Sequence, residues 1–239
     1  WLYLLLARGG FWRATVGDWD DAGTPPLSGA WPDVIAIVPA RDEAQVIGAC
    51  VRSLLAQDYP GAFRVVVVDD DSSDATSARA HEAARLMHAE ERLVVLRAPR
   101  ARDYEAWRQL RRESREFLKP YEPRWTEADL NRQAFGARLI RGRKEAKRGT
   151  DFSFLIFDAT GPQEALVGGL TVSNIRRRAA QHANLGYWMG APFAGRGLMT
   201  EAVGTLLPFY FETLHLHRLH AAFLPHNIAS RRVLEKNGF

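Results

Sequence analysis

Apolar residues in the first 92 positions follow two alternating patterns. Residues 34–39 and 64–68 are continuous runs rich in valine and isoleucine, which is typical of strands buried on both faces of a parallel sheet. Residues 43–57 and the alanine-rich stretch from Asp74 to Glu91 repeat apolar residues at helical spacing instead. The resulting order, β-α-β-α, predicts the opening of a doubly wound sheet.

After residue 92 the pattern predicts a different kind of fold. Strands alternate with charged, amphipathic helices, and two of the strands are joined by a turn at Thr160-Gly161-Pro162, so antiparallel pairing is expected. The fold class is therefore α/β, with a parallel fragment followed by a mixed, mostly antiparallel α+β domain. The expected strands are residues 92–96, 152–157, 165–172, 183–189 and 217–224, and the expected helices are residues 104–112, 127–147, 198–209 and 225–238.

Charge divides the chain at the same place. The overall charge of +4 combines a net −6 over residues 1–92 with a net +10 over residues 93–239, and lysine is absent before Lys119. We infer that two unrelated sequences meet near this point. The Arg/Lys run of residues 127–147 is interpreted as a solvated helix face, with binding of an acidic partner as the alternative.

These changes predict three segments, residues 1–32, 33–92 and 93–239. Residues 1–13 combine a short apolar run with Trp, Tyr and Arg. The run is too short to span a bilayer, and it matches either the end of a longer spanning helix or a turn packed on the domain. Residues 14–32 are expected to form a polar linker.

The single cysteine, Cys50, cannot form an intrachain disulfide, and no Cys/His cluster has the spacing of zinc ligands. Both observations favour a cytoplasmic protein, with the inner face of the membrane as the alternative if residues 1–13 reach it. Because Cys50 lies within an apolar helical pattern, we expect its side chain in the core.

Carboxylates gather directly after the second predicted strand, at Asp69 to Asp71 and at Asp74. Doubly wound sheets bind ligands at the carboxyl ends of their strands, so these side chains can accept hydrogen bonds from a nucleotide. The alternative is structural, in which residues 71–74 only cap the next helix through Ser72, Ser73 or Asp74. The acidic turn alone does not decide between the two.

Three segments taken together are more specific, since residues 39–44, 54–60 and 67–76 resemble the family 2 glycosyltransferases. Residues 4–12 look most like the membrane-associated members linked to hopanoid synthesis. The resemblance ends near residue 95, before that family's metal-binding Asp-x-Asp and catalytic base. It therefore implies a nucleotide site but not glycosyl transfer, and no metal ligand is assigned. The residues implied to line the nucleotide pocket are Pro39, Glu43, Asp69 and Asp70.

A second candidate site is the turn Gly195-Arg196-Gly197, which follows a predicted strand and precedes a predicted helix. A pyrophosphate needs backbone N–H groups that side chains do not shield, and the first turn of a helix supplies such donors together with a favourable dipole. Glycines let the chain curl close to the phosphates, and Arg196 could add a charged contact. A plain strand-to-helix turn is the alternative.

This turn, the strand before it, and the strand and helix of residues 217–239 closely resemble the GNAT acetyltransferases, and among them the ribosomal-protein-alanine N-acetyltransferases. The resemblance covers residues 93–239. It implies transfer of the acetyl group of acetyl-CoA to an amine, either a protein N-terminus, with ribosomal proteins as candidates, or another acceptor, without direct contact to nucleic acid. The residues implied to hold acetyl-CoA are Tyr187, Trp188, Met189, Gly195, Arg196, Gly197, Leu198, Met199, Thr200 and Asn227.

The implied catalytic residues depart from the general GNAT pattern. Leu234 stands where many members have a tyrosine that acts as a general acid. Ser230 is therefore the candidate that protonates the departing thiolate, against the alternative of a surface serine. No general base is assigned, because Asn184 stands where an acidic residue would be convenient. A water chain, His182 and His226 are the alternatives.

The GNAT family normally continues past the position of Phe239 with two further strands, so we expect an exposed sheet edge and reduced stability. Three interpretations stay open: an acetyltransferase, which leads; a nucleotide-sugar glycosyltransferase; and a non-catalytic fusion of two incomplete domains. Both families place a strand like residues 92–96 at this point of the chain. The junction is therefore interpreted as a crossover at a shared pattern.

Overall fold

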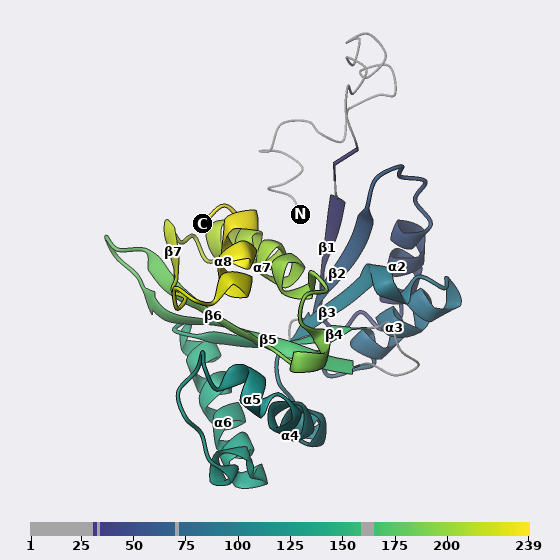
Figure 1. The fold of residues 1–239 in the computed structure, drawn as a ribbon. Coiled ribbons are helices and arrows are strands. Elements are labelled where there is room, and N and C mark those ends of the chain that lie inside the picture. Colours follow the sequence, from purple (N-terminus) through teal and green to yellow (C-terminus); the bar gives the residue numbers. More distant parts are fainter. Residues whose placement is uncertain (1–30, 33, 70–71, 159–164) are drawn as a thin grey trace.

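The computed structural model describes residues 31–32, 34–69, 72–158 and 165–239. The strands in these ranges form one seven-stranded sheet whose order follows the chain (Figure 1). The strands are β1 (Val34–Ala40), β2 (Phe63–Asp69), β3 (Leu93–Arg97), β4 (Phe152–Asp158), β5 (Ala165–Arg176), β6 (His182–Met189) and β7 (Arg218–Ala221).

The pairing of the strands changes from parallel to antiparallel in the middle of the sheet and back to parallel near its end. β1, β2 and β3 are parallel, β3 to β6 pair antiparallel, and β6 pairs parallel with β7. This arrangement confirms the predicted class, a parallel beginning followed by a mixed, mostly antiparallel sheet. β3 is the joining strand, since it pairs parallel with β2 on one side and antiparallel with β4 on the other.

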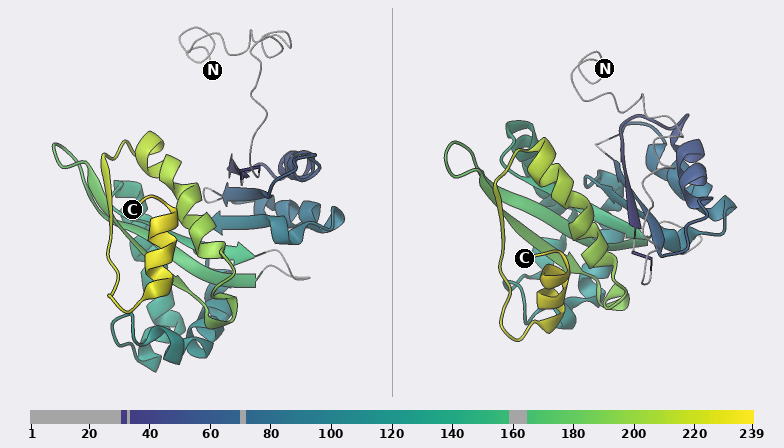
Figure 2. Two further views of the ribbon diagram at one scale, coloured as in Figure 1. Left: turned by 45° about the horizontal axis from the view of Figure 1, so that its top comes forward. Right: turned by 90° about the horizontal axis from the view of Figure 1, so that it is seen from above.

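Helices cover both faces of the sheet. α2 to α6 lie on one face, and α7 and α8 lie together on the other (Figure 2). The α-helices are α2 (Ile47–Leu55), α3 (Thr76–Leu86), α4 (Tyr104–Glu113), α5 (Arg115–Leu118), α6 (Arg132–Arg148), α7 (Leu198–Pro208) and α8 (Ile228–Lys236). Short turns precede or extend several of them, namely η3 (Glu90–Arg92), η4 (Ala101–Asp103), η5 (Glu127–Leu130), η6 (Ala191–Phe193) and the π-helical η7 (Phe209–Thr213).

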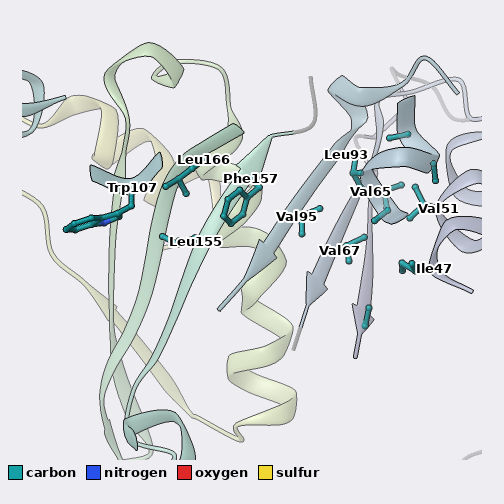
Figure 3. Packing of buried hydrophobic residues seen from close by; sticks show 14 of the residues in the cluster. Ile47, Val51, Val65, Val67, Leu93, Val95, Trp107, Leu155, Phe157 and Leu166 are labelled. Atoms are coloured by element: carbon teal, nitrogen blue, oxygen red, sulfur yellow. The ribbon is translucent and has the colours of Figure 1, made fainter. Parts of the chain in front are cut away.

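Each face of the sheet has one hydrophobic core, and both cores cross the junction near residue 93. On the α2–α6 face, Val65 and Val67 of β2 belong to the same cluster as Phe157 and Leu166 (Figure 3). On the opposite face, Val66 of β2 belongs to a cluster built mainly from α7 and the later strands. The alternation along β2 thus sends neighbouring valines into two different cores.

Two predictions about burial were wrong. β1 is not buried on both faces. Ala36 and Val38 pack against one core, but Ile35 and Ile37 on the other face belong to neither core and are 37% and 38% exposed. Cys50 is exposed, because α2 turns Val51 and Leu55 toward the sheet and Cys50 lies off that stripe. An apolar run shows that a strand forms, but not how many of its faces are covered.

Several element boundaries also differ from prediction. The first helix starts at Ile47 rather than near residue 43. Asp42 lies just before the predicted start but does not cap the helix. It has a positive φ of 53° and accepts a hydrogen bond from the backbone N–H of Ser73. Residues 127–130 form a separate 3-10 turn before α6, whose side chains are mostly exposed, as expected for a solvated basic face.

Three predicted features lie outside the described residues: the membrane-proximal segment and most of its linker, Asp70, and the turn at Thr160-Gly161-Pro162. Among the residues that are described, no helix combines the length and the apolar character needed to cross a membrane. β7 is the last strand of the sheet and pairs with β6.

Candidate functional site

β6 and β7 are paired along only half of β6. Their register runs from His182 opposite Arg218 to Leu185 opposite Ala221 and then stops. β6 continues to Met189 with its other edge still paired to β5. Beyond Leu185, the β7-facing edge of β6 therefore presents main-chain N–H and C=O groups outside the ladder, which a ligand can use.

The chain leaves this open strand through a turn that leads directly into α7. Gly195 and Gly197 have positive φ angles of 80° and 85°, a conformation that glycine adopts without steric cost. Gly197 is the N-cap of α7, and its position offers no side chain to the first N–H groups. A Cβ built on Gly195 would meet nothing within 4 Å, so the backbone of the turn is open to approach.

Two ion pairs flank the turn. Arg196 Nη2 lies 3.0 Å from Asp158 Oδ2, a carboxylate at the end of β4 that is 2% exposed. The Arg196 side chain is itself 42% exposed, so pairing with Asp158 leaves much of it in contact with solvent. On the other side, Arg64 of β2 forms an ion pair with Glu201 in the first turn of α7.

Ser230 and Tyr187 meet between α8 and the open half of β6. The Tyr187 hydroxyl is 2.7 Å from Ser230 Oγ and 3.2 Å from the Ser230 carbonyl oxygen. Burial raises the pKa of Tyr187 above its usual value, and the hydrogen bond to Ser230 offsets this only in part. The phenol therefore stays protonated at neutral pH and can donate a proton.

Asn227 and Leu234 have structural positions in α8. Asn227 is the N-cap of this helix, and its side-chain oxygen accepts a hydrogen bond from the Ser230 N–H at 3.0 Å. This cap fixes the start of α8 and therefore the position of Ser230 relative to Tyr187. Leu234 is 4% exposed and packs in the core under α7, so a proton donor at its position is absent.

The two histidines named as alternatives for the general base, and Asn184, lie at two separate places. His182 and Asn184 belong to the paired half of β6, before the strands separate, and His182 packs edge-on against His220 with ring centroids 5.3 Å apart. His226 stacks on Tyr121 at 5.7 Å. A general base is therefore still not assigned, and the water chain, His182 and His226 remain the alternatives.

The opposite face of β6 carries a cluster that sequence patterns did not single out. Arg111 of α4 lies 4.9 Å from the ring centroid of Trp188 and 5.1 Å from that of Trp125. Its guanidinium also donates to Glu122 at 2.6 Å. Alternation along β6 places Trp188 on the face opposite Tyr187, which was the only signal in the sequence that could have predicted this cluster.

The predicted nucleotide pocket is partly occupied by the chain itself. Asp69 is 1% exposed, and it accepts hydrogen bonds from the Ser72 N–H at 2.8 Å and from Arg100 at 2.9 Å. Pro39 and Glu43 are exposed. Asp69 therefore organises a turn and forms an ion pair. The predicted N-cap is not seen, since the N-cap of α3 is Ala75, which has no side-chain cap hydrogen bond.

Comparison with known families places these features in context. Residues 93–239 match the model of the acetyltransferase (GNAT) domain. The chain belongs to the GNAT acetyltransferase family. Residues 35–109 match the model of glycosyl transferase family 2, so both predicted resemblances are confirmed. The two matches overlap over residues 93–109, which include the joining strand β3 and most of α4.

Curated relatives support the same division. The [ribosomal protein uS5]-alanine N-acetyltransferase of Escherichia coli is 34% identical over 139 residues, which are 57% of this chain and 71% of that protein. An N-acetylglucosaminyltransferase of Mesorhizobium japonicum is 41% identical over 54 residues, which are 22% of this chain and 13% of that protein. The chain therefore contains most of an acetyltransferase but only a small piece of a glycosyltransferase.

Solved structures agree with the acetyltransferase assignment. RimJ of Mycobacterium smegmatis, determined in complex with CoA-disulfide, is similar with a TM-score of 0.55 and 31% identity, covering 59% of this chain and 68% of that one. The ribosomal-protein-S5-alanine acetyltransferase of Vibrio fischeri is similar with a TM-score of 0.57 and 27% identity, covering 60% and 78%.

Proposed function

We propose that this chain transfers the acetyl group of acetyl-CoA to a primary amine, and that the acceptor is the N-terminal amine of a protein of the ribosomal class. The observation that carries the proposal is the open half of β6 followed directly by the glycine turn and the N-terminus of α7. The acceptor class rests on the names of the relatives, which act on ribosomal proteins.

Main-chain groups would hold most of acetyl-CoA. The N–H groups of the first turn of α7 suit the pyrophosphate, and the unpaired edge of β6 suits the amide groups of the pantetheine arm. Asn227 uses its side-chain oxygen to cap α8, so it would contribute its amide N–H₂ group. The proposed binding residues remain Tyr187, Trp188, Met189, Gly195, Arg196, Gly197, Leu198, Met199, Thr200 and Asn227.

Acetyl-CoA supplies an activated thioester when it is bound. The chain's own task is to orient the amine and to move protons, since the amine nitrogen bonds to the acetyl carbon while the bond from carbon to sulfur breaks. Ser230 Oγ is the proposed donor to the departing sulfur. Tyr187 Oη, 2.7 Å away, can return a proton to Ser230. A water chain, His182 or His226 would accept the proton of the amine.

The location and the remaining alternatives rest on sequence. Contact of residues 1–13 with the inner face of a membrane, from the cytoplasmic side, is proposed on their composition alone. Glycosyl transfer is not favoured, because Asp69 is engaged by Arg100 and Ser72. A non-catalytic fusion stays the alternative that a binding experiment must exclude.

Thermal unfolding in the presence of acetyl-CoA tests the proposal. At about 100 times its Kd, a ligand that binds only the folded state stabilises it by about 2.7 kcal/mol, which raises the Tm of a chain of this size by roughly 5–10 °C. Gly195→Val and Gly197→Val should each abolish this shift, because valine is strained at their positive φ angles and shields the amides.

Gly142→Val on the exposed face of α6 is the matched control, since a Cβ there meets nothing within 4 Å, and its shift should equal that of the wild type. An unchanged Tm in wild-type protein with acetyl-CoA would refute acetyl-CoA binding. A shift with UDP-sugar and Mn²⁺ instead would favour the glycosyltransferase alternative, and no shift with either would favour the non-catalytic fusion.

A further inference from the structure

The glycine turn of residues 195–197, called the phosphate turn below, leads into α7. This helix packs on the glycosyltransferase-like part of the chain, residues 33–92. Val66 of β2 is fully buried and shares a core with Leu198 and Val203 of α7. Arg64 lies two residues before Val66 on the same strand, so it points to the same face of the sheet. There it forms an ion pair with Glu201 of α7, 137 residues away in the sequence.

Glu201 is pressed against the phosphate turn. A Cβ built on Gly197 would lie 3.6 Å from Glu201 Oε1, the oxygen that pairs with Arg64. The second oxygen, Oε2, is buried and has no hydrogen-bond partner among the described residues. The Glu201 side chain is 14% exposed, so water screens its charge only in part.

A carboxylate in this position has opposite effects on the helix and on an anionic ligand. It stabilises the first turn of α7 through the helix dipole, but it repels a pyrophosphate bound to the same N–H groups. On the other side of the turn, Arg196 balances Asp158. Arg64 balances Glu201 in the same way, so the two pairs leave the positive end of the helix dipole available to an anion.

We infer that Arg64, contributed by the glycosyltransferase-like part, is a positioning residue of the acetyl-CoA phosphate site, which acts through Glu201 by cancelling its charge beside Gly195 and Gly197. This inference rests on the proposed function. It gives the fused segment a role in cofactor binding, although residues 1–92 carry a net charge of −6 and as a whole oppose an anion.

Calorimetric titration of four proteins with acetyl-CoA tests the inference. Arg64→Gln leaves Glu201 unbalanced and should raise Kd about fivefold to tenfold at low salt, in proportion to one uncompensated, partly screened charge near the phosphates. Glu201→Gln leaves Arg64 unbalanced and should lower Kd by a similar factor. The double variant should return to within about twofold of the wild type, because charge balance is restored.

Arg52→Gln is the matched control, since α2 places this residue on the opposite face of the sheet, and its Kd should equal that of the wild type. A salt of about 0.5 M should shrink the effect of Arg64→Gln. A merely structural role for Arg64 predicts weaker binding that Glu201→Gln fails to relieve, and that result would overturn the inference, as would an unchanged Kd in Arg64→Gln.

Two further outcomes also have a defined meaning, namely a variant that does not fold and a wild-type protein that does not bind. If Arg64→Gln does not fold, Glu201→Gln alone decides: tighter binding than the wild type supports the inference, and equal or weaker binding refutes it. If wild-type protein does not bind acetyl-CoA, the proposed function itself has failed, which is a different result from equal binding by wild type and variants.

Discussion

Tyr187 and Ser230 bring two hydroxyl groups together from different elements, β6 and α8. Many GNAT acetyltransferases have a tyrosine on the helix, but the corresponding residue here, Leu234, belongs to the core. The Tyr187 hydroxyl instead reaches Ser230 from the strand at 2.7 Å. Since burial raises the pKa of Tyr187, the pair holds its protons at neutral pH and can act as a donor relay.

Substitution of either hydroxyl should lower turnover more than it lowers acetyl-CoA binding. Ser230→Ala should reduce kcat by about 10²-fold, the usual contribution of a general acid, and Tyr187→Phe by a smaller factor. Steady-state rates against an N-terminal alanine peptide, with Kd measured separately, check both. Ser53→Ala on α2 is the control.

The pH profile separates a relay from a packing role for Tyr187. Because its pKa is raised, wild-type kcat should decline only above about pH 10, the ordinary value for tyrosine, and Tyr187→Phe should lack the part of this decline that the phenol causes. Identical profiles, together with full activity of Ser230→Ala, would rule the relay out.

At the scale of elements, the winding of α7 changes at its C-terminal end, from an α-helix to a π-helical turn. Pro208 has no N–H to donate, and after it the chain forms a π-helical turn, with the Leu214 N–H donating to the Phe209 carbonyl at 2.9 Å. This turn carries Tyr210 into the core, where it is fully buried and its hydroxyl has no hydrogen-bond partner among the described residues. Burial raises the pKa of Tyr210 far above its usual value.

Tyr210→Phe should therefore stabilise the protein by about 1 kcal/mol, because it removes a buried polar group that lacks a partner. It should also flatten the loss of stability in alkali. Unfolded tyrosine ionises near pH 10, while folded Tyr210 stays protonated. The ionisation of Tyr210 therefore leaves the free energy of unfolding unchanged below about pH 10 and lowers it as the pH rises further. Denaturant unfolding at about pH 8 and at about pH 10.5 measures both effects.

Tyr104→Phe provides the contrast. Its hydroxyl is buried too, but it donates to the Leu130 carbonyl, so its loss should destabilise the protein. Destabilisation by Tyr210→Phe of the same size as that by Tyr104→Phe would contradict the account of Tyr210.

At the scale of the whole molecule, two sequence families share one sheet and two cores. The division at residues 32/33 and 92/93 stays a prediction about sequence patterns. Packing does not follow this division, because β3 pairs with β2 on one side and with β4 on the other. In addition, α7 shares a core with Val66, which precedes the boundary, and with Val94, which follows it. We therefore expect the described parts to unfold together.

Val66→Ala, in the glycosyltransferase-like part, should lower the stability of the entire chain by about 2 kcal/mol through the cavity that it leaves. Differential scanning calorimetry should show one endotherm whose calorimetric and van't Hoff enthalpies agree, displaced to lower temperature. Ile35→Ala on the exposed face of β1 should have a much smaller effect. Two endotherms, with only one displaced, would show that the parts unfold independently.

Local patterns predicted the helices and strands well, because the periodicity of apolar residues that distinguishes them depends only on a few neighbouring residues. The turn at Gly195 and Gly197 was predicted to lie between a strand and a helix, and both glycines have a positive φ there. Its binding of a pyrophosphate stays a prediction. Coverage was harder to predict. Whether Ile35 is buried depends on what packs over β1 at the edge of the sheet, and the local sequence of β1 does not determine this.

The parts of the candidate site that escaped prediction are those that depend on distant partners. Arg64 and Glu201 are separated by 137 residues, and neither position is unusual in its local pattern. Tyr187 was predicted only to help hold acetyl-CoA, and the hydrogen bond of its hydroxyl to Ser230 follows only from the placement of α8 over β6. Cys50 could have been placed correctly, since the stripe Ile47, Val51 and Leu55 leaves it out.

The position of α7 over the first strands also sets an order of events during synthesis. Val66, Val94 and Leu96 have left the ribosome long before their cover, since α7 begins about 100 residues after β3 ends. At about 5–20 residues per second, this apolar face waits roughly 5–20 s for its partner. We therefore expect the nascent chain to need a chaperone that shields this apolar surface until α7 has been synthesised and can cover it.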